Sequence, residues 1–577
     1  MRRIGVPGLV VALVVMLGTG VGASLAAFTA TTSNAGNSFS AAAVDSTPPT
    51  ISRAVAAKPS GATPATIRQG GDYYVYAEVT DASAIASVTA NLSTVDAGVT
   101  ATALSSGSWT VGGQSYNYRS ALLTANTPLI TGTSYSYSVT ATDALGNGGS
   151  QTYSVAIETY EQVVEATSGL VSLWRMGSAP TVADGFTGTA GATLQSRAGE
   201  LGATWTKHAW STVDGVTSDA GRLRKNGTGR ALYHASGTPA SASYAVEADV
   251  HVKSLAASDM AGVAGRVATA ASTFYLARYE VPTASWTLIK VVNGTRTALG
   301  SFAQTLTAGS TYRVRLDMSG TTIRVFVDGV QRISVTDAGI AAAGRGGVVL
   351  GDDATAGAAV SDTVGLHLDN VRVVANTGTT MSDAFGTNPG TFANSPLLNV
   401  SGALVGDFNG ATSFNGTNQY ASVPDASSLD RGDGPLSTEA WVRRDDATTG
   451  YHDILNKGAG SLQWAFNGSD HRLVKAGTGT IASATGAAAD TTAYHHWVAT
   501  KNGAVVKLYR DGVDVTPATI TNQTLGDTAT ALYLATKDGT AVSGEFLKAR
   551  LDEVAIYSQA LPAATVLDHY KVGTGTG

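Results

Sequence analysis

One stretch of sequence occurs twice in this chain, and the two copies align without a gap. Residues 312–329 and 495–512 each contain two strands joined by a turn, and they lie 183 positions apart. A second phrase, Leu-Asp-x-Val, recurs at 368–371 and 551–554 with the same offset. Such self-similarity indicates two copies of one β domain. Any prediction of function therefore has to start from two related β domains.

The composition agrees with a large protein made of strands. The 577 residues suggest roughly three or four domains of about 150 residues each. Glycine is abundant (67 residues), 43% of the chain is apolar and only 14% is charged, which suits strands joined by small-residue turns. The formal charge of −6 favours no polyanion, so nucleic acid is not an expected partner. Cysteine is absent, so large cores must hold the domains without disulfides.

The first residues predict export. Arg2 and Arg3 precede an unbroken apolar run at 9–17, and small residues follow up to Ala26, which is typical of a secretory signal peptide. We predict a signal peptide over 1–27, a linker over 28–44, and a secreted protein that is extracellular or at the cell surface, with no membrane span after cleavage. The alternative is an uncleaved anchor, although the apolar run falls short of the roughly 20 residues of a spanning helix. Residues 27–39 resemble leaders of bacterial surface and biofilm-matrix proteins.

Residues 45–158 predict a first sandwich. The prolines at 48–49 stiffen an extended opening. Apolar residues alternate with a period of two at 74–79, 135–139 and 153–157, as expected of strands that bury one face. The opening and the closing hairpin around 140–157 resemble bacterial immunoglobulin-like domains.

The two repeat copies resemble jelly rolls. Residues 182–375, with strands at 244–252 and 274–279, are similar to concanavalin A-like domains of the laminin-G-like or keto-disaccharide-hydrolase-like kind. Residues 376–572 resemble a laminin-G-like jelly roll more closely, through the segments 411–424, 437–442, 495–499 and 551–557. Such domains open with an apolar strand that carries a tryptophan, and 170–177 resembles that strand.

The position of that opening strand predicts a nested arrangement. The strand before 376 already closes the first jelly roll, so the resemblance implies that 165–180 plus 376–572 form one domain and that 182–375 is inserted into it. Insertion is easy because the chain ends of a sandwich often lie close together. We therefore predict an all-β fold, an immunoglobulin-like sandwich followed by two concanavalin A-like/laminin-G-like jelly rolls, the first inserted in the second. The alternative is that 165–180 is only a linker strand.

Signals for catalysis are poor, so we predict no catalytic residues. Glu247 and Asp249 lie on one face of a strand, as a glycoside hydrolase would require, but no third acid follows because His251 takes the next position. No Gly-x-Ser-x-Gly elbow, cysteine nucleophile or His-Glu-x-x-His motif occurs. His495 and His496 are adjacent strand residues and face opposite sides, so they cannot easily share a metal ion.

Sugar recognition requires exposed aromatic rings beside polar groups, so the tryptophans are the first candidates. Trp174, Trp441 and Trp497 fall in apolar-alternating strands and are expected in cores. The remaining candidates lie nearer turns, and the ones at 451–467 share a loop-rich region. The candidate ligand-binding residues are Trp464, Tyr451, His452, Asn467, Trp205, Trp210 and Trp286. The alternative for the tryptophans is edge packing that closes the sandwiches.

Calcium is the candidate cofactor, because it takes several oxygen ligands and jelly rolls often bring acids from the chain start and chain end together. The candidate pairs are Asp184 with Asp369, and Asp383 with Asp552. Each aspartate of the Leu-Asp-x-Val phrase has an alternative role, capping a hairpin or accepting from a backbone amide.

Three functions remain open at this point. The first is an exported, non-catalytic protein that binds a polysaccharide, a cell-surface glycan or a surface protein through its jelly rolls. The second is a structural matrix or adhesion component that binds no glycan, as the leader suggests. The third is a glycoside hydrolase that uses Glu247 and Asp249. Fold alone does not decide, because the same sandwich hosts binding, catalysis and scaffolding.

Overall fold

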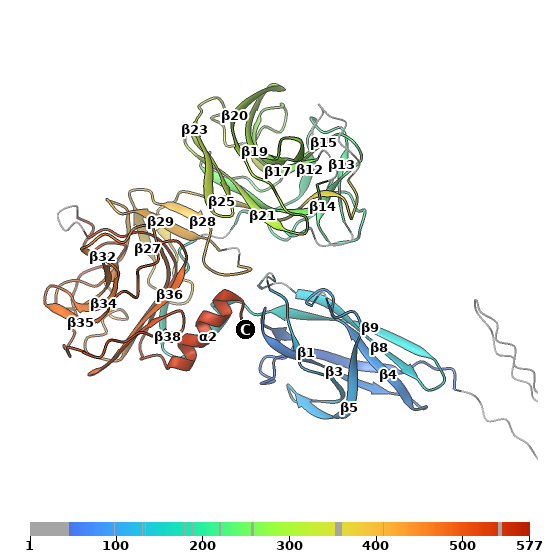
Figure 1. Cartoon of the computed structure of the whole chain (residues 1–577), viewed down its shortest axis with the longest axis horizontal. Coiled ribbons are helices and arrows are strands. Elements are labelled where there is room, and N and C mark those ends of the chain that lie inside the picture. Colours follow the sequence, from blue (N-terminus) through green and yellow to red (C-terminus); the bar gives the residue numbers. More distant parts are fainter. Residues whose placement is uncertain are drawn as a thin grey trace, which may run out of the picture.

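The described residues form three β sandwiches, and helices α1 (Tyr160–Glu165) and α2 (Ala563–Thr574) lie where two of them meet, as the computed structural model shows (Figure 1). The described residues are 45–577 without 97, 128, 130, 133, 178–179, 187, 219–220, 256–258, 352–359, 408 and 541–544. The signal peptide (1–27) and linker (28–44) that the sequence predicts lie outside them. Within the described part, no helix is long and apolar enough to cross a bilayer.

The first sandwich is one continuous sheet that spans both layers, because β5 pairs with β4 through its first residues and with β6 through the rest. Tyr73, Val75 and Ala77 alternate into its core, so the period-two pattern predicts the strand, but Tyr74 and Tyr76, which carried that pattern, lie on the opposite face in a second cluster. Its strands, in sheet order, are β1 (Thr50–Ala57), β3 (Asp72–Thr80), β6 (Gln114–Ser120), β5 (Thr102–Val111), β4 (Ile85–Asn91), β8 (Ser134–Asp143), β9 (Gly148–Ile157) and β2 (Thr66–Ile67), with β7 (Leu123–Thr124) beside β3. The immunoglobulin-like assignment of this sandwich stays a prediction.

The second sandwich, which we call the guest, packs two sheets around Trp205, Trp286 and Tyr275. Its first sheet runs β13 (Asp214–Thr217), β14 (Leu223–Asn226), β25 (Gly365–Ala375), β16 (Tyr244–Ser254), β21 (Thr311–Ser319), β22 (Thr322–Val327) and β23 (Val330–Thr336), with β11 (Val182–Asp184) beside β25. Its second sheet runs β12 (Trp205–Lys207), β15 (Arg230–Ala235), β24 (Arg345–Gly351), β17 (Met260–Val267), β18 (Phe274–Glu280), β19 (Ser285–Val292) and β20 (Thr295–Ala303), and a 3₁₀ turn η1 (Val281–Thr283) links two of these strands.

The third sandwich, the host, is built around Trp174, Trp464 and Trp497. Its first sheet runs β28 (Leu397–Val400), β29 (Ala411–Asn415), β40 (Lys548–Tyr557), β31 (Leu436–Arg444), β36 (His495–Asn502), β37 (Val505–Arg510) and β38 (Val513–Asp514), with β10 (Leu170–Trp174) beside β40. Its second sheet runs β26 (Thr380–Met381), β27 (Gly390–Ala393), β30 (Tyr420–Val423), β39 (Leu532–Leu534), β32 (Tyr451–Asn456), β33 (Leu462–Asn467), β34 (Asp470–Lys475) and β35 (Gly479–Ala484).

Guest and host share one strand order, and the guest is inserted in the host. β10 pairs with β40, so the host sheet contains a strand from before the guest and strands from after it. The guest begins and ends on adjacent antiparallel strands, because Val182 pairs with Val373, which is why two host strands can receive it. The predicted all-β fold with nested jelly rolls is confirmed.

The repeated Leu-Asp-x-Val phrase is a β-bulge in both copies. Asn370 and Glu553 are the extra residues, and their φ angles of 49° and 48° lie in the left-handed region. The added residue lets the leucine and the valine on either side of it both face the core. Leu368 and Val371 are fully buried for this reason. The repeat is therefore a constraint on folding.

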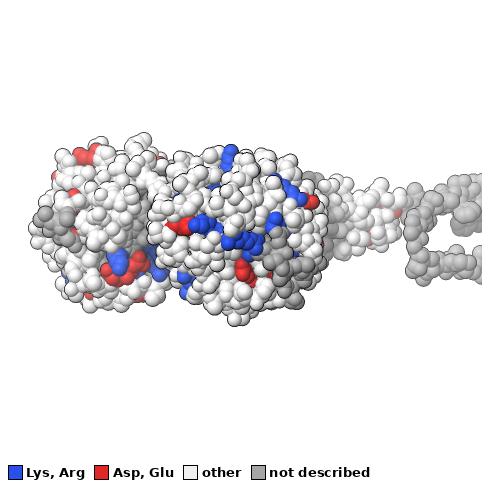
Figure 2. Space-filling model, turned by 90° about the horizontal axis from the view of Figure 1, so that it is seen from above, with Lys and Arg blue, Asp and Glu red and all other residues white. Residues whose placement is uncertain are grey.

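Helix α2 lies between the host and the first sandwich (Figure 1). Its Asp568 accepts two hydrogen bonds from Arg68, at 2.5 and 3.2 Å, and the carbonyl of Gly575 accepts one from Thr127 at 2.7 Å. Beneath the helix, Glu439 of β31 is fully buried. On the face drawn in Figure 2, most of the surface carries no charged side chain, and Lys and Arg lie in small groups, some of them beside Asp and Glu.

Candidate functional site

The four tryptophans predicted to bind glycan are buried, so that prediction is wrong for them. Trp464, Trp205 and Trp286 have no exposed surface, and Trp210 is 5% exposed. Three of the indole N–H groups donate hydrogen bonds inside the fold. Trp464 donates to His471, Trp205 to Asp184 and Trp286 to Gln304. The physical reason is the strand period of two. Because Leu462 and Phe466 face the core, Trp464 between them must face it as well.

Tyr451 and Asn467 do lie on the outer face of the host's second sheet, whereas His452 does not share it. Tyr451 and Asn467 are paired across β32 and β33, and both are half-buried. His452 bonds the carbonyl of Phe546 through Nδ1 at 2.8 Å. This outer face carries the candidate site, which we call the polar face. Its members are Tyr420, Tyr451, Asp453, Asn456, Gln463, Arg472, Tyr533, Lys537 and Glu545.

The polar face follows from the pairing register of five strands. One row across the sheet reads Ser422, Tyr533, Asn456 and Gln463, and the next contains Asp453, Ala465 and Arg472. Tyr533 lies next to Tyr420, with ring centroids 6.0 Å apart, and both rings are partly exposed. The Arg472 guanidinium lies 5.6 Å from the centre of the Tyr451 ring. Aromatic rings thus stand on both sides of a polar centre.

Asp453 is fully buried at the bottom of that polar centre. Its carboxyl group accepts from Gln463 and Asn456, each at 2.7 Å, and Gln463 also donates to Glu545 at 3.2 Å. Burial raises the pKa of Asp453 to about 7, helped by the charge of Glu545 and opposed by the two hydrogen bonds. Glu545 and Lys537 pair above it at 3.3 Å and are partly exposed. Asp453 and Asn456 have no exposed surface and Gln463 is 4% exposed, so the charged groups that can contact a ligand are the partly exposed Lys537, Glu545 and Arg472.

The corresponding face of the guest differs, although its scaffold is the same, and a buried charged residue there is Arg278, which is 2% exposed and pairs with Glu280 at 2.8 Å. Ala264 and Leu276 occupy the positions of Asn456 and Gln463, and Gly347 occupies that of Tyr533. Ala264 and Leu276 belong to an apolar cluster that also contains Trp210, with the Arg230 guanidinium 4.1 Å from the Trp210 ring. A buried carboxyl group costs stability, so the Asp453 network, which differs from the Arg278–Glu280 pair of the guest, is a candidate for a functional role.

The sequence indicates that Gln463 lies on this outer face, although a choice of residues near turns does not include it. Gln463, Ala465 and Asn467 alternate with the apolar Leu462, Trp464 and Phe466, so the polar residues had to share the outer face. Asp453 and Glu545 are 92 positions apart. Only the pairing of strands could bring them together.

The predicted calcium pairs serve other purposes inside the fold. Asp184 accepts from Trp205 at 2.6 Å, pairs with Arg197 at 3.1 Å and accepts from the amide of Phe186. Asp369 lies 3.5 Å from Arg222, and burial raises its pKa to about 7. Asp184 and Asp369 thus each have an arginine, Arg197 or Arg222, as a counter-charge.

The second predicted pair also differs from a metal site. Asp383 accepts from four backbone amides, those of Leu173, Phe385, Gly386 and Asn388. It fixes a turn and thereby β10. Asp552 accepts from the amide of Ala403 at 2.8 Å, and burial raises its pKa to about 7. The alternative of backbone-bound aspartates is therefore what the structure shows.

An oxygen-rich position in the host is filled by a lysine. Nζ of Lys457 lies 2.5 Å from Asp425, 3.0 Å from Asp430 and 2.7 Å from the carbonyls of Thr528 and Thr530. Lys457 is 2% exposed. Two carboxylates and two carbonyls are the ligands that a hard cation prefers, and here the ammonium group takes that place.

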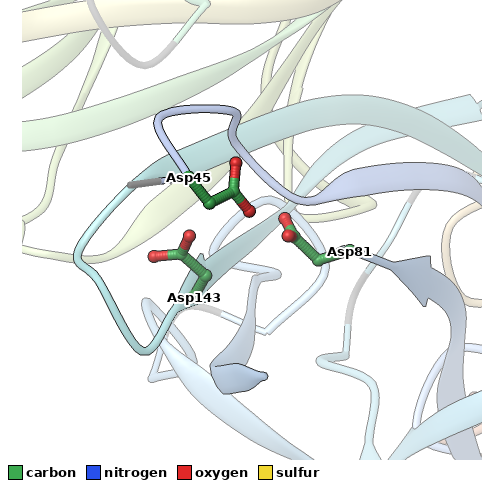
Figure 3. A group of neighbouring side chains, drawn as sticks. All are labelled: Asp45, Asp81 and Asp143. Atoms are coloured by element: carbon green, nitrogen blue, oxygen red, sulfur yellow. The ribbon is translucent and has the colours of Figure 1, made fainter. Parts of the chain in front are cut away.

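Among the described residues, one group of three carboxylates could hold a metal ion. Asp45, Asp81 and Asp143 of the first sandwich turn their carboxylates toward one another (Figure 3), with one oxygen of each within 4.8 Å of the others. One oxygen of Asp45 and one of Asp81 are buried without a hydrogen-bond partner. Burial alone would raise the pKa of Asp143, but hydrogen bonds from Asn147, Ser83 and Leu145 lower it to about 2. These carboxylate ligands suit calcium. The sequence indicates the segments that contain Asp45 and Asp143, but it does not indicate that the two residues lie close together.

The residues of the hydrolase alternative are engaged in ion pairs. Glu247 is buried and pairs with Arg372, and Asp249 accepts two bonds from Arg313, at 2.8 and 3.1 Å. Asp249 stands directly opposite Asp369 on the neighbouring strand. Both oxygens of Asp249 are occupied by the Arg313 guanidinium, which disfavours Asp249 as the activator of a water molecule.

Comparison with known proteins gives a family match for part of the host. A comparison with curated proteins finds no match. Among solved structures, the chain is similar to the carbohydrate-binding module CBM66 from Bacillus subtilis, with 17% identity over 30% of this chain and 95% of that one, at a TM-score of 0.24.

Two further solved structures are similar at comparable levels. Domain 4 of AbnA, an extracellular arabinanase from Geobacillus stearothermophilus solved with arabinotriose, is 18% identical over 33% of this chain and 92% of its own, with a TM-score of 0.26. Domains LG4-5 of the mouse laminin alpha1 chain are 13% identical over 58% and 90%, with a TM-score of 0.21. Residues 415–567 match the family model described as the concanavalin A-like lectin/glucanases superfamily.

Proposed function

We propose that this protein is an exported, non-catalytic binding protein whose host jelly roll recognises carbohydrate through the polar face. The observation that carries the proposal is the buried Asp453 network, which is flanked by partly exposed tyrosines and which the guest replaces with alanine and leucine. Sugars are bound by stacking on aromatic rings while amides and carboxylates take the hydroxyl groups. On the polar face, the partly exposed tyrosines supply the rings, and Lys537, Glu545 and Arg472 supply the polar groups.

A glycan array with the full chain tests the proposal. We expect binding to a defined set of glycans, and a loss of about tenfold in affinity for Tyr533→Ala, since one lost ring contact is worth about 1.5 kcal/mol. Tyr74→Ala in the first sandwich is the matched control, because Tyr74 is also half-buried but lies away from the host. An array with no binding, together with self-association of the chain, would support the matrix or adhesion alternative instead.

The same array tests the calcium requirement. We expect binding to the polar face to persist in EDTA, because its acidic groups are served by Gln463, Asn456 and Lys537. Loss of glycan binding on chelation would contradict a cation-independent polar face. It would make the three aspartates of Figure 3 the candidate calcium site.

The non-catalytic part of the proposal has its own test. Incubation with each glycan that binds is expected to release no reducing ends. Hydrolysis that disappears in Asp369→Asn or Glu247→Gln would overturn this part, because those carboxyl groups lie on the one guest face that carries opposed acids. Export is checked by mass spectrometry of the mature protein in the culture medium, where the first peptide is expected to begin after residue 27.

A further inference from the structure

A small cleft opens at the seam between guest and host. Its guest wall consists of Arg313 and Arg315 on β21 and Glu247 on β16, and its host wall includes Ser401 and Arg550. The enclosed volume is about 20 Å³, the space of one small polar group and not of a sugar ring. The cleft is distinct from the polar face, which lies on the other sheet of the host.

Positive charge dominates this cleft. Three arginines line it against one carboxylate, and that carboxylate, Glu247, is already paired with Arg372. Burial lowers the pKa of Arg372, Glu247 raises it, and the charges of Arg313 and Arg315 lower it further, so the guanidinium groups repel one another. An added anion would relieve this repulsion.

Arg550 is the least satisfied of the three arginines. Arg313 is held by Asp249 at 2.8 Å and Arg315 by Asp317 at 3.0 Å. The Nε atom of Arg550 is buried without a hydrogen-bond partner, and its Nη1 reaches only the carbonyl of Gly329, at 3.5 Å. A guanidinium group binds carboxylate or sulfate oxygens through parallel N–H bonds. Arg550 therefore has unused donor capacity at the cleft.

Packing alone does not account for arginines on this face. The host positions that correspond to Arg313 and Arg315 are His496 and Val498, 183 residues later. Those residues are buried, and Val498 packs with α1 and α2 residues in one apolar cluster. The guest carries charged residues at the same positions. The host segment 397–401 covers them, and its carbonyls at Leu398 and Asn399 accept from Arg315.

We propose that the guest–host seam is an anion-binding site that takes a single carboxylate or sulfate group, held by Arg550 of the host and by Arg313 and Arg315 of the guest. The anion has two sources of the same chemistry, a free inorganic anion or an acidic group on a saccharide. Because the ligand touches both jelly rolls, its binding links them. The proposal does not depend on the polar face.

The test measures binding by the full chain in two arms. The first titrates sodium sulfate against sodium chloride at equal ionic strength and follows the thermal unfolding temperature. The second titrates trigalacturonate, with neutral maltotriose as its control, by calorimetry. We expect saturable binding in at least one arm, and at least about a tenfold weakening in Arg550→Gln, the loss of roughly one charged hydrogen bond. Binding of sulfate alone identifies a free anion as the ligand, and binding of trigalacturonate identifies an acidic saccharide.

Two further variants keep the result interpretable. Lys207→Gln removes one positive charge from the guest's other sheet and is expected to leave both titrations unchanged, which separates a specific site from general attraction. Ser401→Asp places a carboxylate at the cleft, so it is expected to raise the unfolding temperature and abolish anion binding. If Arg550→Gln binds as tightly as the wild type, or if neither anion binds, the proposal is overturned. Tyr533→Ala, which tests the polar face, is expected to leave sulfate binding unchanged.

Discussion

Single residues decide which oxygen clusters of this protein are open to a cation. Lys457 fills a cluster of two carboxylates and two carbonyls, and Arg197 fills that of Asp184. A side-chain cation is covalently attached, so its local concentration is fixed, and the cluster is satisfied at any calcium concentration. Acidic residues at plausible positions can therefore be satisfied without a metal ion.

Removal of the lysine ammonium should convert its cluster into a cation site. Lys457→Met leaves Asp425 and Asp430 facing each other without a counter-charge, and since both are partly exposed we expect a loss of about 2 kcal/mol. Millimolar calcium should restore part of that loss, which thermal unfolding with and without calcium measures. Lys507→Met is the control, because Lys507 and Asp514 form an exposed pair. Equal stability of Lys457→Met and the wild type would contradict this reading.

At the scale of elements, a buried ion pair holds the two helices on the host. Glu439 accepts from Tyr160 at 2.6 Å, Tyr557 at 2.7 Å, His496 at 2.7 Å and His569 at 3.0 Å. Thr167 donates its hydroxyl proton to the carbonyl of Val163, so its oxygen accepts from Nε2 of His569. Both ring nitrogens of His569 are then donors, and the ring is an imidazolium ion.

The docking of α2 should therefore depend on pH. Burial alone would lower the pKa of His569, but Glu439 raises it, so this contribution is complete below about pH 6.5 and is lost as pH rises through the folded value. Burial alone would raise the pKa of Glu439, but His569 and His496 lower it, so its contribution is complete above about pH 4.5 and is lost toward acid.

Hydrogen exchange of residues 563–574 measures this effect. Protection is expected to be highest between about pH 4.5 and 6.5, after correction for the intrinsic exchange rate, and to fall toward alkaline pH. His569→Gln is expected to be less protected and to lose the alkaline dependence. Protection that rises steadily from pH 6 to 9 would show that the imidazolium assignment is wrong.

At the scale of the whole molecule, two glycines let the first sandwich reach the host. A Cβ on Gly406 would lie 1.9 Å from the carbonyl oxygen of Leu129, and a Cβ on Gly70 would lie 1.9 Å from that of Gly575. Both glycines have positive φ. The contact is therefore specified by backbone approach as well as by the Arg68–Asp568 ion pair.

Gly406→Ala should detach the first sandwich from the host. Gly113→Ala is the control, because Gly113 has the same φ of 76° but open space where its Cβ would stand, so it suffers the backbone strain without the clash. We expect a larger radius of gyration by small-angle scattering and a separate unfolding transition for Gly406→Ala only. A compact Gly406→Ala protein would mean that the interface adapts.

The nested arrangement predicts which pieces fold alone. A variant that joins residue 180 to residue 376, and so lacks the guest, keeps β10 and is expected to fold. The fragment 378–577 lacks β10 and with it Trp174, which is fully buried and donates to the carbonyl of Asn388 at 2.8 Å. It is expected to be less stable by at least about 3 kcal/mol, the cost of a lost core tryptophan. Equal unfolding temperatures for the two would count against a shared sheet.

Much of the fold could be predicted from sequence because its determinants are local or repeated. Period-two alternation places strands, the 183-residue repeat marks two related domains, and the apolar segment around Trp174 indicates the strand that the host lacks. The candidate site could not be predicted in the same way. Alternation tells which residues share a face, as for Gln463 and Asn467, but it does not tell which strands become neighbours.

Sequence by itself determined the all-β class and the duplication and indicated the nesting, because these follow from side-chain periodicity and chain order. Only the tertiary structure decided which polar groups meet. Asp453 meets Glu545, Glu439 meets His569, and Arg550 meets Arg313, through pairings and seams between distant segments. The tertiary structure also decided that the tryptophans near turns are core residues, because the burial of a side chain depends on what the rest of the chain packs against it. The chemistry of this protein therefore resides in contacts that strand order creates.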